Sequence, residues 1–470
     1  MRADLLTDAV DGLDEALAAV DGFDEVLVAG LLRPQPAQAE GLFALADAVA
    51  GSPLASRVAE AAEKAAAGAA GEDHFIALAA ARTALLGSVH DALTVRVEEA
   101  VGRPRAEEGA DGAGSPGDGD EHAANLHVAA REWLCNLARA GWKGIDHELV
   151  TGAAPVVSAM LPDPALRRPA TLLDGFAAEL AASCPGATLE RVPVRRWADL
   201  WSRALLLTVP GAAPAPATAE VSGRLLPLGI DLQEHATAVQ AQVHAVFEPA
   251  DGGVPRLVRA SVSAPKPDTV VGAGLWQLLR PRMSLLAAVS EGRAMELDAM
   301  PVTAEGDLIW DDARARTGEP AEIFTTARVA LPTAAAFATA PLDRHPARIA
   351  VPVLVEGYAV EEEEEEDGAV AFRIAGQRLS VDAGRIPAAG PLTPEAVASS
   401  GACIGLLRWD AGEFLLQPLA VERKAGRKTV AVHAGAWAGG TTDKAGVRAE
   451  KAATDAVEVL RERAGKLLRK

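Results

Sequence analysis

The sequence has few cysteines and lacks the residue patterns that hold disulfides or zinc. Its three cysteines, Cys135, Cys184 and Cys403, lie far apart, and no two of them form a Cys-x-x-Cys pair. Isolated thiols of this kind are typical of a reducing compartment and supply no cross-linked framework. The helical zinc motif His-Glu-x-x-His is also absent. We therefore expect a cytoplasmic protein without a metal or any other cofactor.

Motifs for nucleophilic catalysis and phosphate binding are missing as well. No Gly-x-Ser-x-Gly elbow and no Gly-x4-Gly-Lys-Ser/Thr loop occur, which argues against a serine hydrolase and a P-loop ATPase. Gly112, Gly114 and Gly117 match a Gly-x-Gly-x-x-Gly pattern. A dinucleotide site, however, needs a buried strand before the first glycine, and here that stretch is charged and glycine-rich. The sequence thus favours a protein that is not an enzyme.

Long apolar runs are absent too. The chain is acidic from Asp4 onward, so its first residues lack the apolar core of a signal peptide. The longest uncharged run near the middle, 204–219, is interrupted by three prolines. Such a run is too short and too broken to span a bilayer as a helix. We expect a soluble protein without a membrane anchor.

Positive charge is scarce, since 45 basic side chains face 65 acidic ones for a net charge of −20. Residues 1–150 carry 11 basic and 26 acidic side chains, or −15, and residues 151–400 carry 21 and 31, or −10. Residues 401–470 carry 13 and 8, or +5. A strongly acidic protein repels a phosphate backbone, so a dedicated nucleic-acid binder is not expected.

At 470 residues the chain exceeds one ordinary hydrophobic core, and two or three domains are expected. Changes in composition and periodicity divide it into an α+β protein with a helical front half and a β-rich back half. The expected parts are a helical domain (1–102), a disordered acidic linker (103–121), a second helical domain (122–208), a proline-rich linker (209–219), an antiparallel β-rich domain (220–440) and a C-terminal helix (441–470).

Apolar residues in the front half recur with helical spacing. Leu6, Val10, Leu13, Leu17 and Val20 are four, three, four and three apart, which predicts one helix with a single apolar face. Similar patterns and helix-start signals predict six further helices, at 37–49, 54–68, 73–99, 123–140, 171–183 and 195–208.

The back half alternates with the period of β-strands. In 238–247 the odd positions are apolar, whereas Gln240, Gln242 and His244 point the other way, as in a half-buried strand. Repeated hairpin turns predict antiparallel pairing in a barrel, a sandwich or two smaller sheets. The turn signals are Asp251-Gly252-Gly253, Glu305-Gly306, Asp367-Gly368, Ala411-Gly412 and Ala425-Gly426. A helical interruption at 272–290, broken near Pro281, should cover one end or face.

Two groups of residues are candidates for a site. Trp197 and Trp201 lie one helical turn apart, which is typical of core or interface packing, with a partner-binding surface as the alternative. Asp343, Arg344 and His345 precede an apolar strand and combine an acid, a base and a cation. They form either a proton-transfer site, together with Asp311 or Asp312, or a salt bridge at the strand entry.

The C-terminal part of the chain concentrates positive charge. One hairpin tip carries Arg423, Lys424, Arg427 and Lys428, which together are a candidate contact for single-stranded nucleic acid. That binding mode requires stacked aromatic residues beside the charge, and few lie nearby in the sequence. The final helix, 445–469, has a narrow apolar stripe that can pack against the body of the protein or another chain. The stripe consists of Val457, Leu460, Ala464 and Leu467.

Four stretches of the chain resemble a group of proteins from high-GC bacteria. They are RRWADLWSRALLL (195–207), LDRHP (342–346), ACIGLLRW (402–409) and LRERAGKLLRK (460–470). The resemblance points to gene clusters that also encode a MoxR-type AAA ATPase, a von Willebrand A protein and a SWIM zinc-finger protein. It supplies no catalytic residues. It implies an accessory component whose partner is the ATPase or the von Willebrand A protein.

Together these features predict a non-enzymatic cytoplasmic interaction protein. An enzyme of unrecognised class with a site near His345 is the first alternative. A nucleic-acid-binding protein that uses the basic C-terminal elements is the second.

Overall fold

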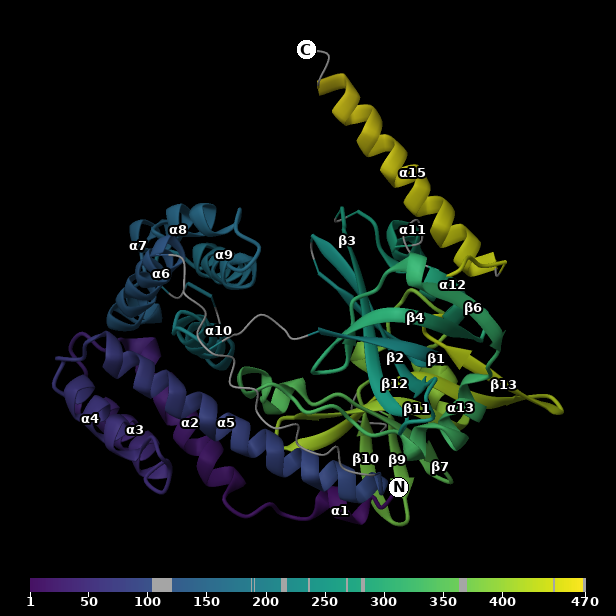
Figure 1. Cartoon of the computed structure of the whole chain (residues 1–470), viewed down its shortest axis with the longest axis horizontal. Coiled ribbons are helices and arrows are strands. Elements are labelled where there is room, and N and C mark those ends of the chain that lie inside the picture. The colour runs from purple at the N-terminus through teal and green to yellow at the C-terminus, as the bar shows by residue number, and fades with distance from the viewer. Residues whose placement is uncertain are drawn as a thin grey trace.

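A computed structural model shows a helical region over residues 4–207, then two mixed, mostly antiparallel sheets and a C-terminal helix (Figure 1). The structure describes residues 1–103, 121–186, 188–189, 191–212, 218–235, 237–267, 269–279, 284–362, 370–442 and 444–467. The predicted α+β class is confirmed, with a helical front half, a β-rich back half and a C-terminal helix in that order. Most of the predicted linker 103–121 and the centre of 209–219 lie outside the described residues.

The six predicted helices of the front half are confirmed to within a few residues. They are α3 (Pro36–Ala48), α4 (Ala55–Ala66), α5 (Glu72–Val101), α6 (Glu121–Ala140), α9 (Arg167–Ala182) and α10 (Val194–Leu207). Two shorter helices, α7 (His147–Thr151) and α8 (Ala153–Met160), lie between α6 and α9.

The single helix predicted through the first apolar stripe is wrong. The chain forms α1 (Asp4–Thr7) and α2 (Leu13–Ala29), with an extended break between them. Gly12 adopts φ +75° in front of α2, a left-handed conformation that glycine reaches at no steric cost. The stripe therefore divides. Leu6 and Val10 pack against the core of the second sheet, whereas Val20 packs in the helical core.

Aromatic side chains fill the centre of the helical region. Trp142 meets the rings of Phe176 and Trp197 edge-on, with centroids 6.0 Å apart in both cases. The ring centroids of Trp201 and of Phe23 in α2 lie 6.3 Å apart, with the two rings tilted by 44°. Edge-to-face pairs of this kind add a specific geometry to the burial of large apolar surfaces. The core thus ties α2, α9 and α10 together.

Helix α5 is the longest element of the chain, and among the described helices it alone is long and apolar enough to cross a bilayer. Half of its most apolar window is buried inside the protein. A core helix passes the same test of length and composition, so the finding is weak evidence for a membrane span.

The first sheet has the strand order β1-β2-β3-β5-β4-β6, and β4 also pairs with β1, so the pairings form a closed ring. Its strands are β1 (Thr218–Glu234), β2 (Ala238–Pro249), β3 (Arg256–Pro265), β4 (Arg293–Thr303), β5 (Asp307–Leu308) and β6 (Ala315–Pro320). The register of β1 shifts between Val221 and Gly223 and again between Pro227 and Gly229. Such bulges increase local bending, which suits a long strand shared by β2 and β4.

The alternation predicted for β2 is confirmed on its inner face and only partly on its outer face. Val239, Val243 and Phe247 are buried in the core of the ring. Gln240 and Gln242 are half-buried, as expected, but His244 is fully buried. The description of β2 as a half-buried strand is therefore wrong at His244, because the second sheet covers this part of the outer face.

The second sheet has the order β7-β11-β12-β10-β9-β8, with β13 paired to β12. Its strands are β7 (Val351–Glu356), β8 (Ala359–Glu362), β9 (Val370–Ile374), β10 (Gln377–Val381), β11 (Ser400–Asp410), β12 (Glu413–Ala425) and β13 (Lys428–His433). Four of the predicted hairpins join antiparallel strands, whereas the Asp367-Gly368 turn lies outside the described residues. Prediction of purely antiparallel pairing misses two short parallel pairs, β3–β5 and β10–β12.

Short helices complete the β region. The predicted interruption at 272–290 appears as a 3-10 turn, η2 (Gly272–Gly274), followed by α11 (Leu275–Leu279) and α12 (Ser284–Ser290), while Pro281 lies outside the described residues. Helix α13 (Ile323–Val329) packs Phe324 into a core shared by the two sheets. A side chain at Gly229 of β1 would approach Leu419 of β12 to 2.8 Å, so glycine allows the sheets to meet closely.

The helical region and the second sheet also share a core. Val89, Leu93 and Val97 on the C-terminal half of α5 pack with Ile349, just before β7, and with Val353 of β7. This contact holds the helical region against the β region. The polar segment 343–345, which lies between them, is therefore held by both.

Candidate functional site

The predicted Asp343-Arg344-His345 segment lies where the helical region meets the β region. Two 3-10 turns, η6 (Pro341–Asp343) and η7 (Pro346–Arg348), enclose it just before β7. Each turn carries a proline at its start, where the fixed φ suits a helical turn and the missing N–H is not needed. The segment is thus held in a defined conformation without belonging to a regular element.

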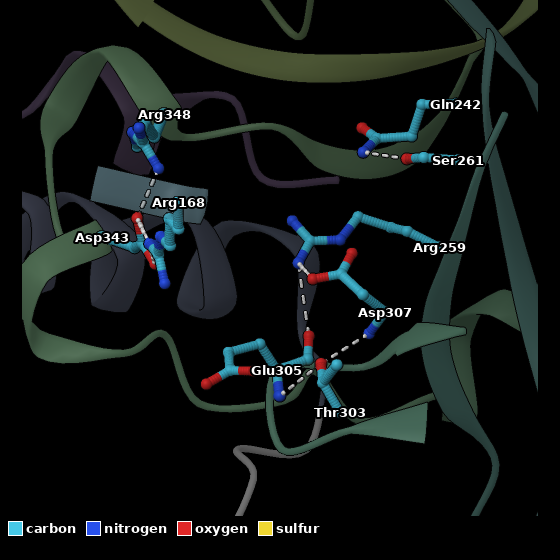
Figure 2. A network of polar contacts seen from close by, with 9 residues as sticks. All are labelled: Arg168, Gln242, Arg259, Ser261, Thr303, Glu305, Asp307, Asp343 and Arg348. Atoms are coloured by element: carbon cyan, nitrogen blue, oxygen red, sulfur yellow. Dashed lines mark hydrogen bonds and ion pairs between the residues drawn. The ribbon is translucent and has the colours of Figure 1, made fainter. Parts of the chain in front are cut away.

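Asp343 lies among three arginines, two of which, Arg168 and Arg348, are drawn in Figure 2. Its carboxylate lies 2.9 Å from Arg203 of α10, 2.5 Å from Arg348 of η7 and 3.3 Å from Arg168 of α9. Burial alone would raise the pKa of Asp343, but the charges of Arg203, Arg348 and Arg168 hold it below its ordinary value. Asp343 is therefore ionised at neutral pH and joins α9 and α10 to the β region.

His345 uses both of its ring nitrogens. Nδ1 accepts the backbone N–H of Ala347 at 3.1 Å, and Nε2 lies 3.2 Å from Asp199 of α10. The two contacts fit one neutral tautomer, in which Nε2 carries the proton and donates it to Asp199. A general base needs a free nitrogen to take a proton from a substrate. In this conformation His345 has none to offer.

Asp199 continues the contacts into the helical core. It accepts a hydrogen bond from Arg82 of α5 at 2.9 Å, and Arg82 also donates to buried Asp24 of α2 at 2.6 Å. Burial works to raise the pKa of Asp199, yet the contacts with His345 and Arg82 outweigh it and hold this pKa well below its usual range. The contacts Asp24–Arg82–Asp199–His345 thus couple three helices, α2, α5 and α10, to the segment that precedes β7.

Arg344 pairs with Asp91 of α5 at 3.1 Å and also donates to the carbonyl of Thr339 at 2.9 Å. Asp311 and Asp312, named as the acids of a proton-transfer site, form other contacts. Asp312 accepts from Ser284 and from the indole of Trp310, while Asp311 pairs with Arg314. The geometry therefore fits the salt-bridge alternative, with all three predicted residues facing the helical region.

The side chains around Asp343 form one polar wall. A second polar wall lies opposite it, on the outer face of the first sheet (Figure 2). Arg259 of β3 pairs with Asp307 of β5 at 2.9 Å, and the amide of Gln242 donates to Ser261 at 3.1 Å. Burial raises the pKa of Asp307, Arg259 opposes that rise, and the negative charge of Asp343 adds to it. The two walls are thus close enough to interact electrostatically.

A buried polar cluster that the sequence did not indicate joins the two sheets. Asp231 of β1 accepts from Gln417 of β12 at 2.8 Å and from Arg408 of β11 at 2.9 Å. His244 of β2 lies nearby, and burial lowers its pKa to about 3. Arg408 and Gln417 lie more than 170 positions from Asp231 in the sequence, so a local pattern could not bring them together. The one local signal is the position of Asp231 between Ile230 and Leu232, whose side chains point into the core from the other face of β1.

A shallow, open depression of about 540 Å³ lies at Lys143 and Pro185 in the helical region, and a half-open pocket of about 510 Å³ lies beside Asp231. The second is lined by polar residues of β1, including Gln233 and Glu234, and by the loop around Arg385. Among the described residues no group of three or more His, Cys, Asp or Glu side chains is arranged to hold a metal ion.

The remaining predicted residues divide between core and surface. Trp197 and Trp201 are 1 % and 0 % exposed, so the structure places both in the helical core. Trp197 donates to Glu179 at 3.2 Å and Trp201 to the carbonyl of Leu134 at 2.9 Å. The basic tip of the β12–β13 hairpin is exposed and carries four predicted residues, Arg423, Lys424, Arg427 and Lys428.

Comparisons of the chain with protein families, curated proteins and solved structures found no match.

Proposed function

We propose that this chain is a non-enzymatic interaction protein that binds a protein partner through its C-terminal helix, α15 (Lys444–Leu467). One observation carries the proposal: α15 projects away from the body of the protein, and its C-terminal end lies far from every other element (Figure 1).

The first part of α15 is anchored to the β region. Gln277 of α11 donates to the carbonyl of Glu450 at 3.0 Å, and the hydroxyl of Thr454 donates to the amide oxygen of Gln277 at 3.1 Å. Beyond this point the described side chains, with the exception of half-buried Ala456, are exposed: Asp455, Glu458, Val459, Glu462 and Arg463. The anchored part sets the direction in which the helix leaves the β region.

The sequence of these last turns suits a groove in a partner. Positions 457, 460, 464 and 467 hold Val, Leu, Ala and Leu at helical spacing. Because short helical segments without tertiary packing are marginally stable in water, docking such an apolar stripe into a groove would stabilise this end of the helix. Helix-in-groove recognition uses the same i, i+3, i+7 anchors.

The positive charge at the end of the helix indicates which kind of partner surface would bind it. Residues 461–470 carry five basic side chains and one acidic one, a net charge of +4 on a protein of −20. Acidic residues beside an apolar groove would complement this end of the helix and discriminate against basic surfaces. The resemblance to components of MoxR-type gene clusters makes the AAA ATPase or the von Willebrand A protein the partner that we propose.

The test measures binding of the full chain to each purified partner by isothermal titration calorimetry. We expect the double variant Val457→Asp/Leu460→Asp to weaken binding at least tenfold. The matched control Asp455→Asn/Glu458→Gln changes two exposed positions of the same helix and should bind like the wild type. Circular dichroism confirms that all chains are folded. Wild-type affinity in the apolar-stripe variant, or no binding of either partner, would overturn the proposal.

A further inference from the structure

We propose that the two polar walls between the helical region and the first sheet form a binding site for the phosphate group of a small phosphorylated ligand. Arg168 and Arg348 supply one side of the site, and Arg259 supplies the other (Figure 2).

The arginines around Asp343 have more donors than Asp343 can use. Each guanidinium has five N–H donors, whereas one carboxylate offers about four acceptor positions. Arg203, Arg348 and Arg168 all share this carboxylate, and Arg203 also donates to the carbonyl of Leu342. Arg168 and Arg348 remain 58 % and 49 % exposed at their side chains. Unused donors on these two residues are thus accessible to a dissolved anion.

The local charge is balanced in a protein that is otherwise strongly acidic. Four guanidiniums, of Arg168, Arg203, Arg259 and Arg348, face four carboxylates, of Asp343, Asp307, Glu305 and Asp199. Burial, followed by the neighbouring charge of Arg203, lowers the pKa of Arg348, which shows that the guanidiniums repel one another. A bound anion would relieve this repulsion.

The geometry favours a tetrahedral anion over a planar one. Arg168, Arg348 and Arg259 approach from three separate elements, α9, η7 and β3. In Figure 2 the guanidinium of Arg259 points towards the group around Asp343. A carboxylate offers two oxygens in one plane, whereas the phosphate group of a monoester presents three terminal oxygens to donors from different directions. Gln242 and Ser261, beside Arg259, add neutral polar groups for the rest of a ligand.

A purely structural role explains these contacts less fully. Arg203, with a side chain only 15 % exposed, already ties Asp343 to α10. The pair between Arg168 and Asp343 is longer and more exposed, and exposed ion pairs add little to stability. Removing the charge of Arg168 should therefore leave the fold intact and change only the affinity for an anion.

The experiment titrates the full chain with inorganic phosphate at constant ionic strength, by calorimetry and by 31P NMR. We expect saturable binding that weakens at least tenfold in Arg168→Gln and in Arg259→Gln. The control Arg373→Gln removes an arginine of similar exposure, paired with Glu361 on the second sheet, and should bind phosphate like the wild type. Thermal unfolding without phosphate should be nearly the same for wild type and Arg168→Gln.

Three results would overturn the proposal. They are no saturable binding to the wild type, equal binding to the wild type and both site variants, or acetate binding as tightly as phosphate. None of them bears on α15, so a failure here is distinguishable from a failure of the proposed partner interaction.

Discussion

Arg408 of β11 donates through Nη2 to Asp231 of β1 at 2.9 Å, so one ion pair links the two sheets. Gln417 of β12 contacts both members, at 2.5 Å to Arg408 and 2.8 Å to Asp231. The side chain of Asp231 is 5 % exposed and that of Arg408 is 13 % exposed. Polar groups this deep tolerate little loss of a partner, because the remaining charge stays buried and uncompensated.

Asp231→Asn should therefore destabilise the protein by about 3 kcal/mol, the typical cost of breaking a buried ion pair from one side. Glu248→Gln is the matched control, since Glu248 pairs with Arg224 at 3.8 Å on the surface, and it should cost less than about 0.5 kcal/mol. Urea unfolding measures both changes. Equal costs would show that the cluster does not hold the sheets together.

Buried His244 and half-buried His433 should each lower stability between pH 6.5 and pH 4, because the fold holds both in the neutral form. Burial lowers the pKa of His244 to about 3 and that of His433 to about 4. Both values lie below the ordinary histidine pKa of about 6.5, so the unfolded chain binds protons first as the pH falls. Each histidine then contributes a loss of up to about 1.4 kcal/mol per pH unit in this window.

Urea unfolding at a series of pH values checks this prediction. His244→Gln should flatten the slope between pH 6.5 and pH 4, although it lowers stability at pH 7 by disturbing the core. The same substitution at exposed His147 should leave the slope unchanged. A wild-type slope in His244→Gln would contradict the assignment.

His345→Ala tests whether this residue is structural. The substitution removes one donor to Asp199 and should cost about 1 kcal/mol, a modest value because the Asp199 side chain is 39 % exposed and Arg82 remains bound to it. His147→Ala, on the surface of the helical region, should cost less than half of that. Thermal unfolding distinguishes the two, and an unchanged melting temperature in His345→Ala would revive the catalytic alternative.

Local pattern predicted the elements of this fold well and their contacts poorly. The six front-half helices follow from apolar spacing and turn signals, which act over a few residues. The break at Gly12 was missed because the stripe from Leu6 to Val20 keeps its spacing across two different cores. The spacing of apolar residues indicates which residues are buried, but it does not indicate which part of the protein they pack against.

The candidate site shows the same limit. The LDRHP stretch was identified as polar chemistry before a strand, yet its partners, Asp91, Asp199 and Arg203, lie on helices more than 130 residues earlier. Asp231 and Arg408 are 177 positions apart and belong to different sheets. Pairing across such separations depends on tertiary packing, which the period of a single strand does not encode.

Trp201 and Trp142 offer a comparison in which burial is matched and hydrogen bonding is not. Both side chains are fully buried. The indole N–H of Trp201 donates to the carbonyl of Leu134 at 2.9 Å, whereas that of Trp142 finds no acceptor among the described residues. Replacement by phenylalanine removes a similar volume and keeps an aromatic ring at each site. Trp201→Phe loses a made hydrogen bond, and Trp142→Phe removes an unsatisfied donor, which is costly when buried.

Trp201→Phe should therefore be the more destabilising by about 1 to 2 kcal/mol in the free energy of unfolding. Denaturant unfolding monitored by circular dichroism measures both variants without relying on tryptophan fluorescence. Trp197→Phe serves as a third point, because its indole donates to partly exposed Glu179 and should fall between the two. If Trp142→Phe proves the most destabilising of the three, the shape of its contacts with Phe176 and Trp197 outweighs the unsatisfied donor.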